Sequence, residues 1–256
     1  MTMASYDYGR AGIAGIGTPQ ANPTVEAEMR LLLPPNVLVA VSRLTSTADQ
    51  PLNRLRDYLE NMDCALEQFD TLRPAVYGFA CTGSSYLVER EHERVILDRL
   101  EARFGCPIVT ATGAIHAELQ RAGARRIALA SPYPSPLAEA AAAYWRASGY
   151  DVAEIRGIDT GSADTRSIYT LGTADARPVA TELAASGVDA VLLSGTGMPS
   201  LALLADPPPG APLFSSNLCL ARALCRALGL AEPGPTHWRP RLAEVLALPD
   251  EGSTPR

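Results

Sequence analysis

Apolar residues follow two different rhythms along the chain. Short runs such as 75–80 and 189–194 are apolar almost throughout, which is typical of strands buried on both faces of a parallel sheet. In residues 51–69 the apolar positions instead recur every three or four residues, which predicts an amphipathic helix. The two rhythms together predict strands at 11–16, 37–41, 75–80, 107–110, 126–130, 152–155, 189–194 and 213–215, and helices at 51–69, 89–104, 115–122, 137–148, 178–186 and 217–230.

This alternation of strands and helices predicts an α/β fold in which helices cover parallel sheets. Two of the buried strands run into similar turns of small residues. The first is followed by CTGSS (81–85) and the second by GTG (195–197). Because ligands of open α/β sheets bind beyond the carboxyl ends of strands, two such turns facing each other would form one site from both halves of the chain.

Composition narrows the class of protein. Hydrophobic residues make up 47% of the 256 positions and charged residues 20%, which is enough apolar material for a sizeable core. The net charge of −6 and the lack of a basic stripe argue against nucleic acid as a partner. A polar amino terminus without a signal-peptide core, and no apolar run of spanning length, predict a cytoplasmic protein with no membrane contact.

Motifs for metals and cofactors are missing from the sequence. The five cysteines are odd in number and scattered, so in a reducing compartment they are free thiols and not a disulfide framework or zinc site. The three histidines have no metal-ligand spacing. No dinucleotide fingerprint, phosphate loop or GxSxG elbow occurs, so we expect neither a metal nor an organic cofactor.

Cys81 is the leading candidate for chemistry because it begins the first of the two turns. Small residues let a ligand approach the backbone, and successive N–H groups before a helix favour an anion such as a carboxylate. The same positive end would lower the pKa of a thiol, which could then donate a proton, accept one or attack as a nucleophile. A buried structural cysteine is the competing interpretation, and the sequence leaves both open.

Two further residues follow other strands and could reach the same cleft. Asn22 lies in the loop after the first strand, and its amide has both a donor and an acceptor for a carboxylate. Tyr133 follows the strand 126–130, where a phenol could donate to a developing enolate oxygen. An Asn-Pro turn and a packed loop tyrosine are equally good interpretations of these positions.

Five short motifs occur in the order of a known family. They are GTPQANPTVE (17–26), CTGSSY (81–86), LASPY (129–133), VLLSGTGMPSL (191–201) and SSN (215–217). Together they resemble the maleate cis-trans isomerase and arylmalonate decarboxylase branch of the Asp/Glu racemase superfamily. The resemblance extends over roughly residues 11–230.

The resemblance implies an α/β fold of two pseudo-symmetric lobes, each with a parallel four-stranded sheet flanked by helices, and an active site in the cleft between them. We expect residues 1–256 to form a single unit. Lobe one would span about 11–110, with the helix 217–230 packing back on it, and lobe two about 111–215. Residues 231–256 would be a C-terminal extension that ends in a loose tail.

The resemblance also assigns residues. It implies that Cys81 is the catalytic thiol of the first lobe and that no cofactor takes part. Gly83 stands where the decarboxylase often has a hydroxyl residue, and Gly195 stands where many members have a second cysteine. The substrate contacts implied by the matching motifs are Asn22, Thr82, Gly83, Ser85, Tyr133, Gly195 and Thr196.

A single thiol argues against racemisation, which needs an acid and a base on opposite faces of the substrate. It suffices for decarboxylation, because one proton is delivered to the carbanion. We therefore expect a malonate-type decarboxylase in which Cys81 protonates the enediolate, with inverted product stereochemistry because the thiol lies in the opposite lobe. The first alternative is a maleate cis-trans isomerase with Cys81 as nucleophile, and the second is a non-catalytic protein that binds a small carboxylate or dicarboxylate. The sequence is compatible with a homo-oligomer but does not give the oligomeric state.

Overall fold

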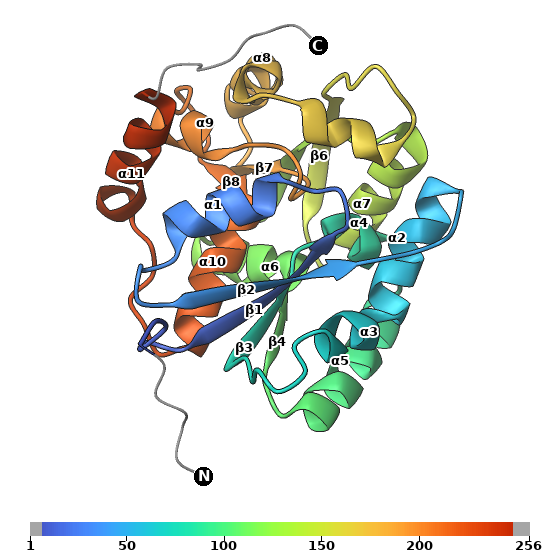
Figure 1. Ribbon diagram of the computed structural model, residues 1–256. Helices are drawn as coiled ribbons and strands as arrows, with labels where there is room; N and C mark the ends of the chain where they lie inside the picture. Colours follow the sequence, from blue (N-terminus) through green and yellow to red (C-terminus); the bar gives the residue numbers. More distant parts are fainter. Residues whose placement is uncertain (1–6, 248–256) are drawn as a thin grey trace, which may run out of the picture.

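Two parallel four-stranded sheets form the framework of the molecule (Figure 1). The computed structural model describes residues 7–247. The strand orders are β2-β1-β3-β4 and β6-β5-β7-β8, so the second sheet repeats the topology of the first and confirms the expected two-part α/β fold. The strands are β1 Ile13–Pro19, β2 Leu38–Leu44, β3 Val76–Phe79, β4 Ile108–Thr110, β5 Arg126–Ser131, β6 Asp151–Gly157, β7 Ala190–Leu193 and β8 Leu213–Ser215.

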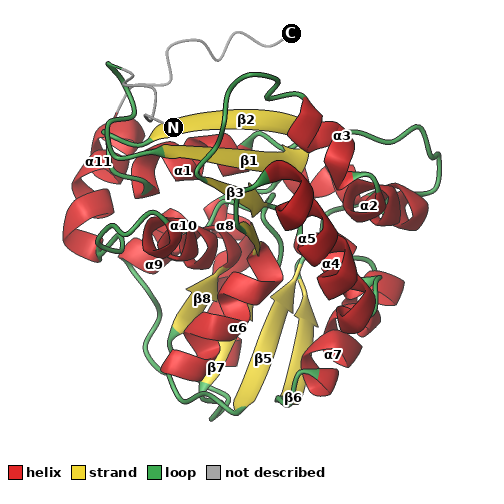
Figure 2. Cartoon of the chain, turned by 90° about the horizontal axis from the view of Figure 1, so that it is seen from below, coloured by secondary structure: helices red, strands yellow, loops and turns green. Residues whose placement is uncertain are grey.

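Helices cover the faces of both sheets, as Figure 2 shows. The central strands β1, β3, β5 and β7 are buried almost throughout, which explains why the sequence is continuously apolar there. The helices are α1 Thr24–Leu32, α2 Pro51–Glu60, α3 Met62–Glu67, α4 Thr82–Tyr86, α5 Arg90–Phe104, α6 Ala111–Arg121, α7 Ser135–Ala147, the 3-10 helix η1 Thr165–Thr170, α8 Thr173–Ala184, α9 Leu201–Ala205, α10 Ser216–Ala227 and α11 Pro235–Ala247.

The expected helix at 51–69 is divided in the structure. Asn61 leaves the helical conformation, with φ −107° and ψ 29°, and thereby separates α2 from α3. Leu59 and Met62 are fully buried on either side of the break, so the apolar rhythm continues although the helix does not. Periodicity therefore predicts the buried face correctly and misses the break.

The segment after residue 230 contains a helix that the sequence pattern did not predict. α11 carries Pro240 inside it, and Trp238 and Leu242 are its buried residues. The helix contacts α1 and α9. The expected loose tail, residues 252–256, lies outside the described part of the chain.

Helix α10 occupies the space between the two sheets (Figure 2). It contacts β3 and β4 of the first sheet, β8 of the second, and helices α1 and α6. Side chains on most sides of α10 are buried, among them Leu220, Leu224 and Cys225. This helix therefore connects residues near the carboxyl end of the chain to the first sheet.

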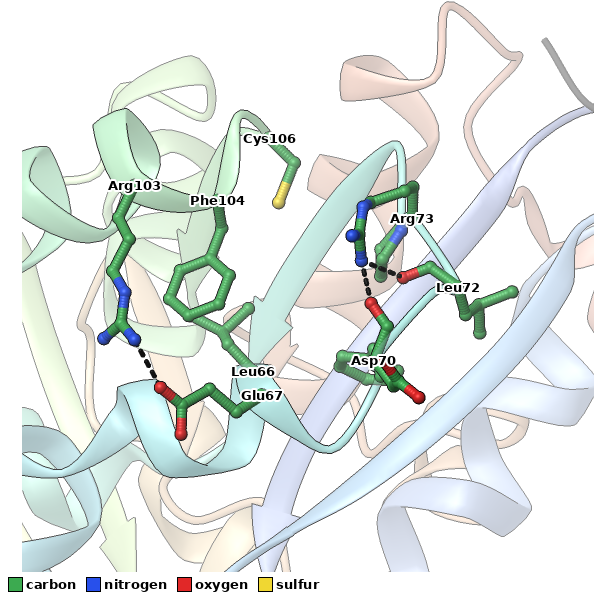
Figure 3. A pocket seen from close by; sticks show the side chains of 10 residues that line it. Leu66, Glu67, Asp70, Leu72, Arg73, Arg103, Phe104 and Cys106 are labelled. Atoms are coloured by element: carbon green, nitrogen blue, oxygen red, sulfur yellow. Dashed lines mark hydrogen bonds and ion pairs between the residues drawn. The ribbon is translucent and has the colours of Figure 1, made fainter.

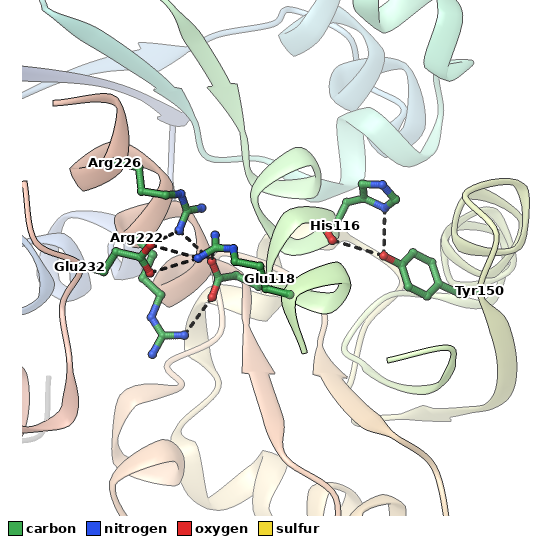
Figure 4. A network of polar contacts seen from close by, with 7 residues as sticks. His116, Glu118, Tyr150, Arg222, Arg226 and Glu232 are labelled. Carbon is green, nitrogen blue, oxygen red and sulfur yellow. Dashed lines mark hydrogen bonds and ion pairs between the residues drawn. The ribbon is translucent and has the colours of Figure 1, made fainter. Parts of the chain in front are cut away.

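A buried carboxylate joins α10 to α6 (Figure 4). The Glu118 side chain is only 6% exposed and accepts hydrogen bonds from Arg222 and Arg226 at 3.0 Å, as well as from Arg121 on its own helix. Glu232 pairs in turn with Arg121 and Arg226. The network satisfies a charge that would otherwise be costly to bury.

We expect Glu118→Gln to lower the free energy of unfolding by about 1–3 kcal/mol, because the substitution removes a buried charge among three partly exposed arginines. Urea unfolding at neutral pH measures the change. Glu232→Gln is the control, since Glu232 is one-third exposed and belongs to the same network. An effect of the control as large as that of Glu118→Gln would contradict the explanation.

Candidate active site

Four polar side chains meet where strands of both sheets end. Asn22 follows β1, Cys81 follows β3, Tyr133 follows β5 and Thr196 follows β7. All four line one narrow cavity. The remaining residues of its wall are Pro19, Leu55, Thr165, Ile168, Tyr169 and Gly197.

Direct hydrogen bonds join the two strand-end turns across this cleft. The Thr196 hydroxyl donates to the carbonyl of Ala80 at 2.8 Å, next to Cys81, and the amide of Asn22 donates to the Thr196 Oγ1 at 3.3 Å. The Asn22 Oδ1 also accepts from the backbone N–H of Thr24 at 2.9 Å. Asn22 therefore orders its own turn and also lines the cavity, and its contact with a ligand stays a prediction.

A second buried carboxylate fixes the turn after β7. Glu28 of α1 accepts the backbone N–H groups of Ser200 at 2.6 Å and Leu201 at 3.1 Å. The Asn217 amide donates to Glu28 at 2.7 Å and to the carbonyl of Thr196 at 3.0 Å. Burial raises the pKa of Glu28, and these donors act in the opposite direction. A helix from the first half of the chain thus holds the residues that face Cys81.

Cys81 lies in a dry environment. It is 4% exposed, and its sulfur accepts a hydrogen bond from the Ser84 hydroxyl at 3.1 Å. Burial raises the pKa of the thiol, while the Ser84 hydroxyl and the backbone N–H groups of Ser84 and Gly83 lower it. The net direction is upward, contrary to the lowering expected from a helix start, because α4 has only five residues and desolvation outweighs it.

Gly195, the expected counterpart of a second cysteine, has a backbone that disfavours a side chain and little space for one. Its φ is +104°, and a Cβ there would lie 3.2 Å from the Tyr133 hydroxyl oxygen. That hydroxyl shares a 2.7 Å hydrogen bond with Thr82, and burial raises the pKa of Tyr133 well above its usual value. The phenol therefore stays neutral and can donate a hydrogen bond into the cavity.

Four of the predicted contacts do not belong to the cavity wall: Gly195, described above, and Thr82, Gly83 and Ser85 of α4. The Thr82 hydroxyl shares a hydrogen bond with the Tyr133 hydroxyl. A Cβ added to Gly83 would lie 3.2 Å from the Leu55 side chain. Ser85 is fully buried and donates to the carboxylate of Glu93 at 2.7 Å. The three residues of α4 shape the turn that carries Cys81, whereas Asn22, Tyr133 and Thr196 can touch a ligand.

The segment after β6 covers the cavity. The Gly-, Ser-, Thr- and Asp-rich composition of residues 158–171 suggests a loop beside the site, and its role as a mobile lid stays a prediction. Thr165 and Tyr169 belong to η1, and the Tyr169 ring lies so close to Gly197 that a Cβ there would be 2.6 Å from Cε1. An ion pair of 2.9 Å between Arg54 of α2 and Asp164 holds the segment in place. The segment is polar and lacks a hydrophobic period, so composition marks it as a loop but neither periodicity nor a motif identifies which of its side chains reach the cavity.

A larger cavity lies away from this chemistry (Figure 3). It has about 840 Å³ of empty space and opens near the amino ends of β3 and β4, beside Cys106. Three of its charged side chains are already engaged: Arg103 pairs with Glu67, and Arg73 donates to the backbone carbonyl of Asp70. Size alone therefore does not identify the site, since ligands of such sheets bind at the carboxyl ends.

Two kinds of feature are absent from residues 7–247. No group of three or more metal-ligating side chains comes together in this range. Its helices are all too short or too polar to cross a bilayer. Fold and site together define a two-lobed α/β protein with one thiol among neutral hydrogen-bond donors.

Comparison with known proteins identifies the family. The family model described as arylmalonate decarboxylase matches residues 73–237, and the chain belongs to this family. The maleate isomerase of Nocardia farcinica is 30% identical over 86% of this chain and 92% of its own length. The maleate isomerase of Pseudomonas putida KT2440 is 26% identical over 83% of this chain and 90% of its own length.

Solved structures agree with this assignment. A cysteine-to-serine mutant of the Nocardia farcinica maleate cis-trans isomerase, with a covalently bound succinylcysteine intermediate, has a TM-score of 0.73 at 26% identity, over 86% of this chain and 93% of that one. A mutant of arylmalonate decarboxylase with one glycine changed to cysteine and one cysteine to serine has a TM-score of 0.73 at 21% identity, over 89% and 97%. The chain is thus an enzyme of the Asp/Glu racemase-like superfamily, as its motifs indicated.

We expect Gly195→Cys to lower the free energy of unfolding by about 1–3 kcal/mol, because the left-handed backbone at this position disfavours any side chain and the new Cβ crowds the Tyr133 hydroxyl. Thermal unfolding measures the loss. Gly157→Cys is the matched control, since its Cβ would meet open space and its backbone is not left-handed. Equal stability of the two variants would contradict the expectation.

We also expect alkylation of Cys81 by iodoacetamide to rise with pH through a midpoint above that of an ordinary thiol, about 8.5. The reason is that burial raises the pKa of this thiol, so the reactive thiolate forms at higher pH. Peptide-resolved mass spectrometry measures the rate at Cys81, with the free peptide CTGSS as reference. A midpoint at or below that of the peptide would sink this expectation.

Proposed function

We propose that this protein is a cofactor-independent cis-trans isomerase of maleate or a closely similar dicarboxylate, with Cys81 as the nucleophile. Isomerisation takes precedence over the decarboxylation expected from the sequence because the named relatives are maleate isomerases. One observation carries the proposal: the Nocardia farcinica enzyme holds a covalent succinylcysteine in a mutant in which one cysteine is replaced by serine. A family member that has lost one cysteine can therefore still carry the adduct.

The cavity offers what such a reaction needs. The Cys81 thiolate adds to one alkene carbon, and the electron pair of the double bond moves into the carboxylate on the neighbouring carbon, which becomes an enediolate. The former double bond is now single and can rotate. Expulsion of the thiolate then restores the alkene in the trans geometry, so no atom is gained or lost.

Neutral donors would bind the substrate and stabilise the enediolate. The amide of Asn22 and the hydroxyls of Tyr133, Thr165 and Thr196 belong to residues that line the cavity. Neither arginine nor lysine occurs in that lining. Such fixed dipoles act where charge develops and need no reorganisation during the reaction.

A malonate decarboxylase is the second candidate. Leu55, Ile168 and Tyr169 give one part of the cavity an apolar wall, which an aryl substituent could contact and maleate does not require. Only one thiol, Cys81, lines the cavity, and one suffices to protonate an enediolate. A carboxylate-binding protein without catalysis is the third possibility. A cytoplasmic location and self-association both stay predictions.

Proton NMR in heavy water, with purified protein and a mixture of maleate and aryl- and alkylmalonates, tests the proposal. We expect maleate to convert to fumarate, and Cys81→Ala to slow this conversion by more than about a thousandfold, because the nucleophile is removed. Cys64→Ala is the control, since Cys64 is exposed and does not line the cavity.

Other outcomes of this experiment separate the candidates. Loss of a malonate with deuterium at its α-carbon, and no fumarate, would replace the proposal with decarboxylation. No conversion of any substrate, together with saturable binding of maleate, would favour a carboxylate-binding protein without catalytic activity. Full activity of Cys81→Ala on maleate would exclude the proposed nucleophile.

A further inference from the structure

We propose that Ser84 is a further catalytic residue, whose hydroxyl holds the sulfur of Cys81 in its reactive thiolate form through a direct hydrogen bond. The inference deepens the proposed function, but it rests only on Cys81 as the reacting group and not on which carboxylate is the substrate. Neither the family motifs nor the sequence pattern singled out Ser84 from the other hydroxyl residues of its turn.

The position of Ser84 in α4 directs its hydroxyl at the sulfur. Cys81 is the residue before the first turn of the helix, with an extended backbone of φ −147° and ψ 100°, and Ser84 is the third residue of that turn. A side chain at this position points back toward the residue before the helix. The Ser84 Oγ lies 3.1 Å from the Cys81 Sγ, and both residues are buried.

The hydroxyl has no competing use. Within residues 7–247 the Cys81 sulfur is the only hydrogen-bond partner found for the Ser84 side chain. An O–H group that donates to sulfur stabilises the anion far more than the neutral thiol, because hydrogen bonds to charged acceptors are the stronger ones. Removing it would leave the thiolate with backbone donors alone.

Among residues 7–247, Ser84 is the one side chain found to donate a hydrogen bond to the sulfur, and the charged and phenolic groups around it make no such bond. Four tyrosines interact electrostatically with Cys81, and burial raises the pKa of each, so all stay neutral near pH 7. The charged groups nearby are Arg54, Asp164 and Arg166, which pair with one another at the covering segment. The tyrosines are Tyr58 of α2, Tyr86 of α4, Tyr133 after β5 and Tyr169 of η1.

Ser85 provides a matched comparison within the same turn. It is the next residue, equally buried and of the same size, but its hydroxyl donates to Glu93 and not to the sulfur. A substitution there removes a buried hydroxyl from α4 without removing the contact to Cys81. Any effect of Ser84 that exceeds the effect of Ser85 therefore reports on the bond to sulfur.

The test is a pH titration of the Cys81 thiol in the wild type, Ser84→Ala, Ser84→Thr and Ser85→Ala. Peptide-resolved alkylation and the ultraviolet absorbance of the thiolate, taken as a difference from Cys81→Ala, give the midpoint independently. We expect Ser84→Ala to shift the midpoint upward by about one pH unit, which slows alkylation at neutral pH about tenfold. Ser84→Thr, which keeps the hydroxyl, and Ser85→Ala should titrate with the wild type.

An unchanged midpoint in Ser84→Ala would overturn the inference, and so would equal shifts in Ser84→Ala and Ser85→Ala. Circular dichroism of each variant shows whether the fold is kept. If Ser84→Ala does not fold, Ser84→Gly replaces it as the variant without a hydroxyl. Its titration midpoint is then compared with the midpoints of the wild type and of Ser84→Thr. Because no substrate is used, the shift can appear even if maleate is not converted, which separates failure of this inference from failure of the proposed function.

Discussion

The buried carboxylate of Glu28 is the interaction on which the geometry of the cleft depends. It stands on a helix of the first half of the chain, yet its acceptor oxygens are satisfied by Ser200, Leu201 and Asn217 of the second half. Asn217, which donates to Glu28, also donates to the carbonyl of Thr196 and so fixes that residue. The hydroxyl of Thr196 in turn accepts a hydrogen bond from Asn22. A charge in the interior is costly unless fully hydrogen-bonded, so the two halves have one relative position that satisfies it.

Given this fixed cleft, reactivity becomes a balance between desolvation and hydrogen bonding at a single sulfur. The closed cavity withdraws Cys81 from water and so opposes its ionisation. The same dryness strengthens every dipole aimed at the sulfur or at a bound carboxylate. The thiol of Cys81 is therefore weakly acidic, and its thiolate is strongly nucleophilic. The hydrogen bonds around it are already formed before a substrate binds.

The sequence predicted the sheets well because buried parallel strands leave a continuous apolar signal, and β8 falls at the expected residues 213–215. It also placed Cys81, Asn22, Tyr133 and Thr196 at one site, since all follow strands. It could not predict the break at Asn61, which no glycine or proline marks. Nor could it predict Tyr169, which reaches the cavity from a polar segment, or the turn of Ser85 toward Glu93, which depends on a neighbouring helix.

The conformation of Gly195 limits how the cleft could be redesigned. Its left-handed backbone suits glycine, and a Cβ at this position would crowd the Tyr133 hydroxyl. A second thiol introduced here would therefore require the main chain or the phenol to move as well. A designer who wants proton transfer from both halves of the cleft would have to rebuild the turn after β7, because exchanging this one side chain is not enough.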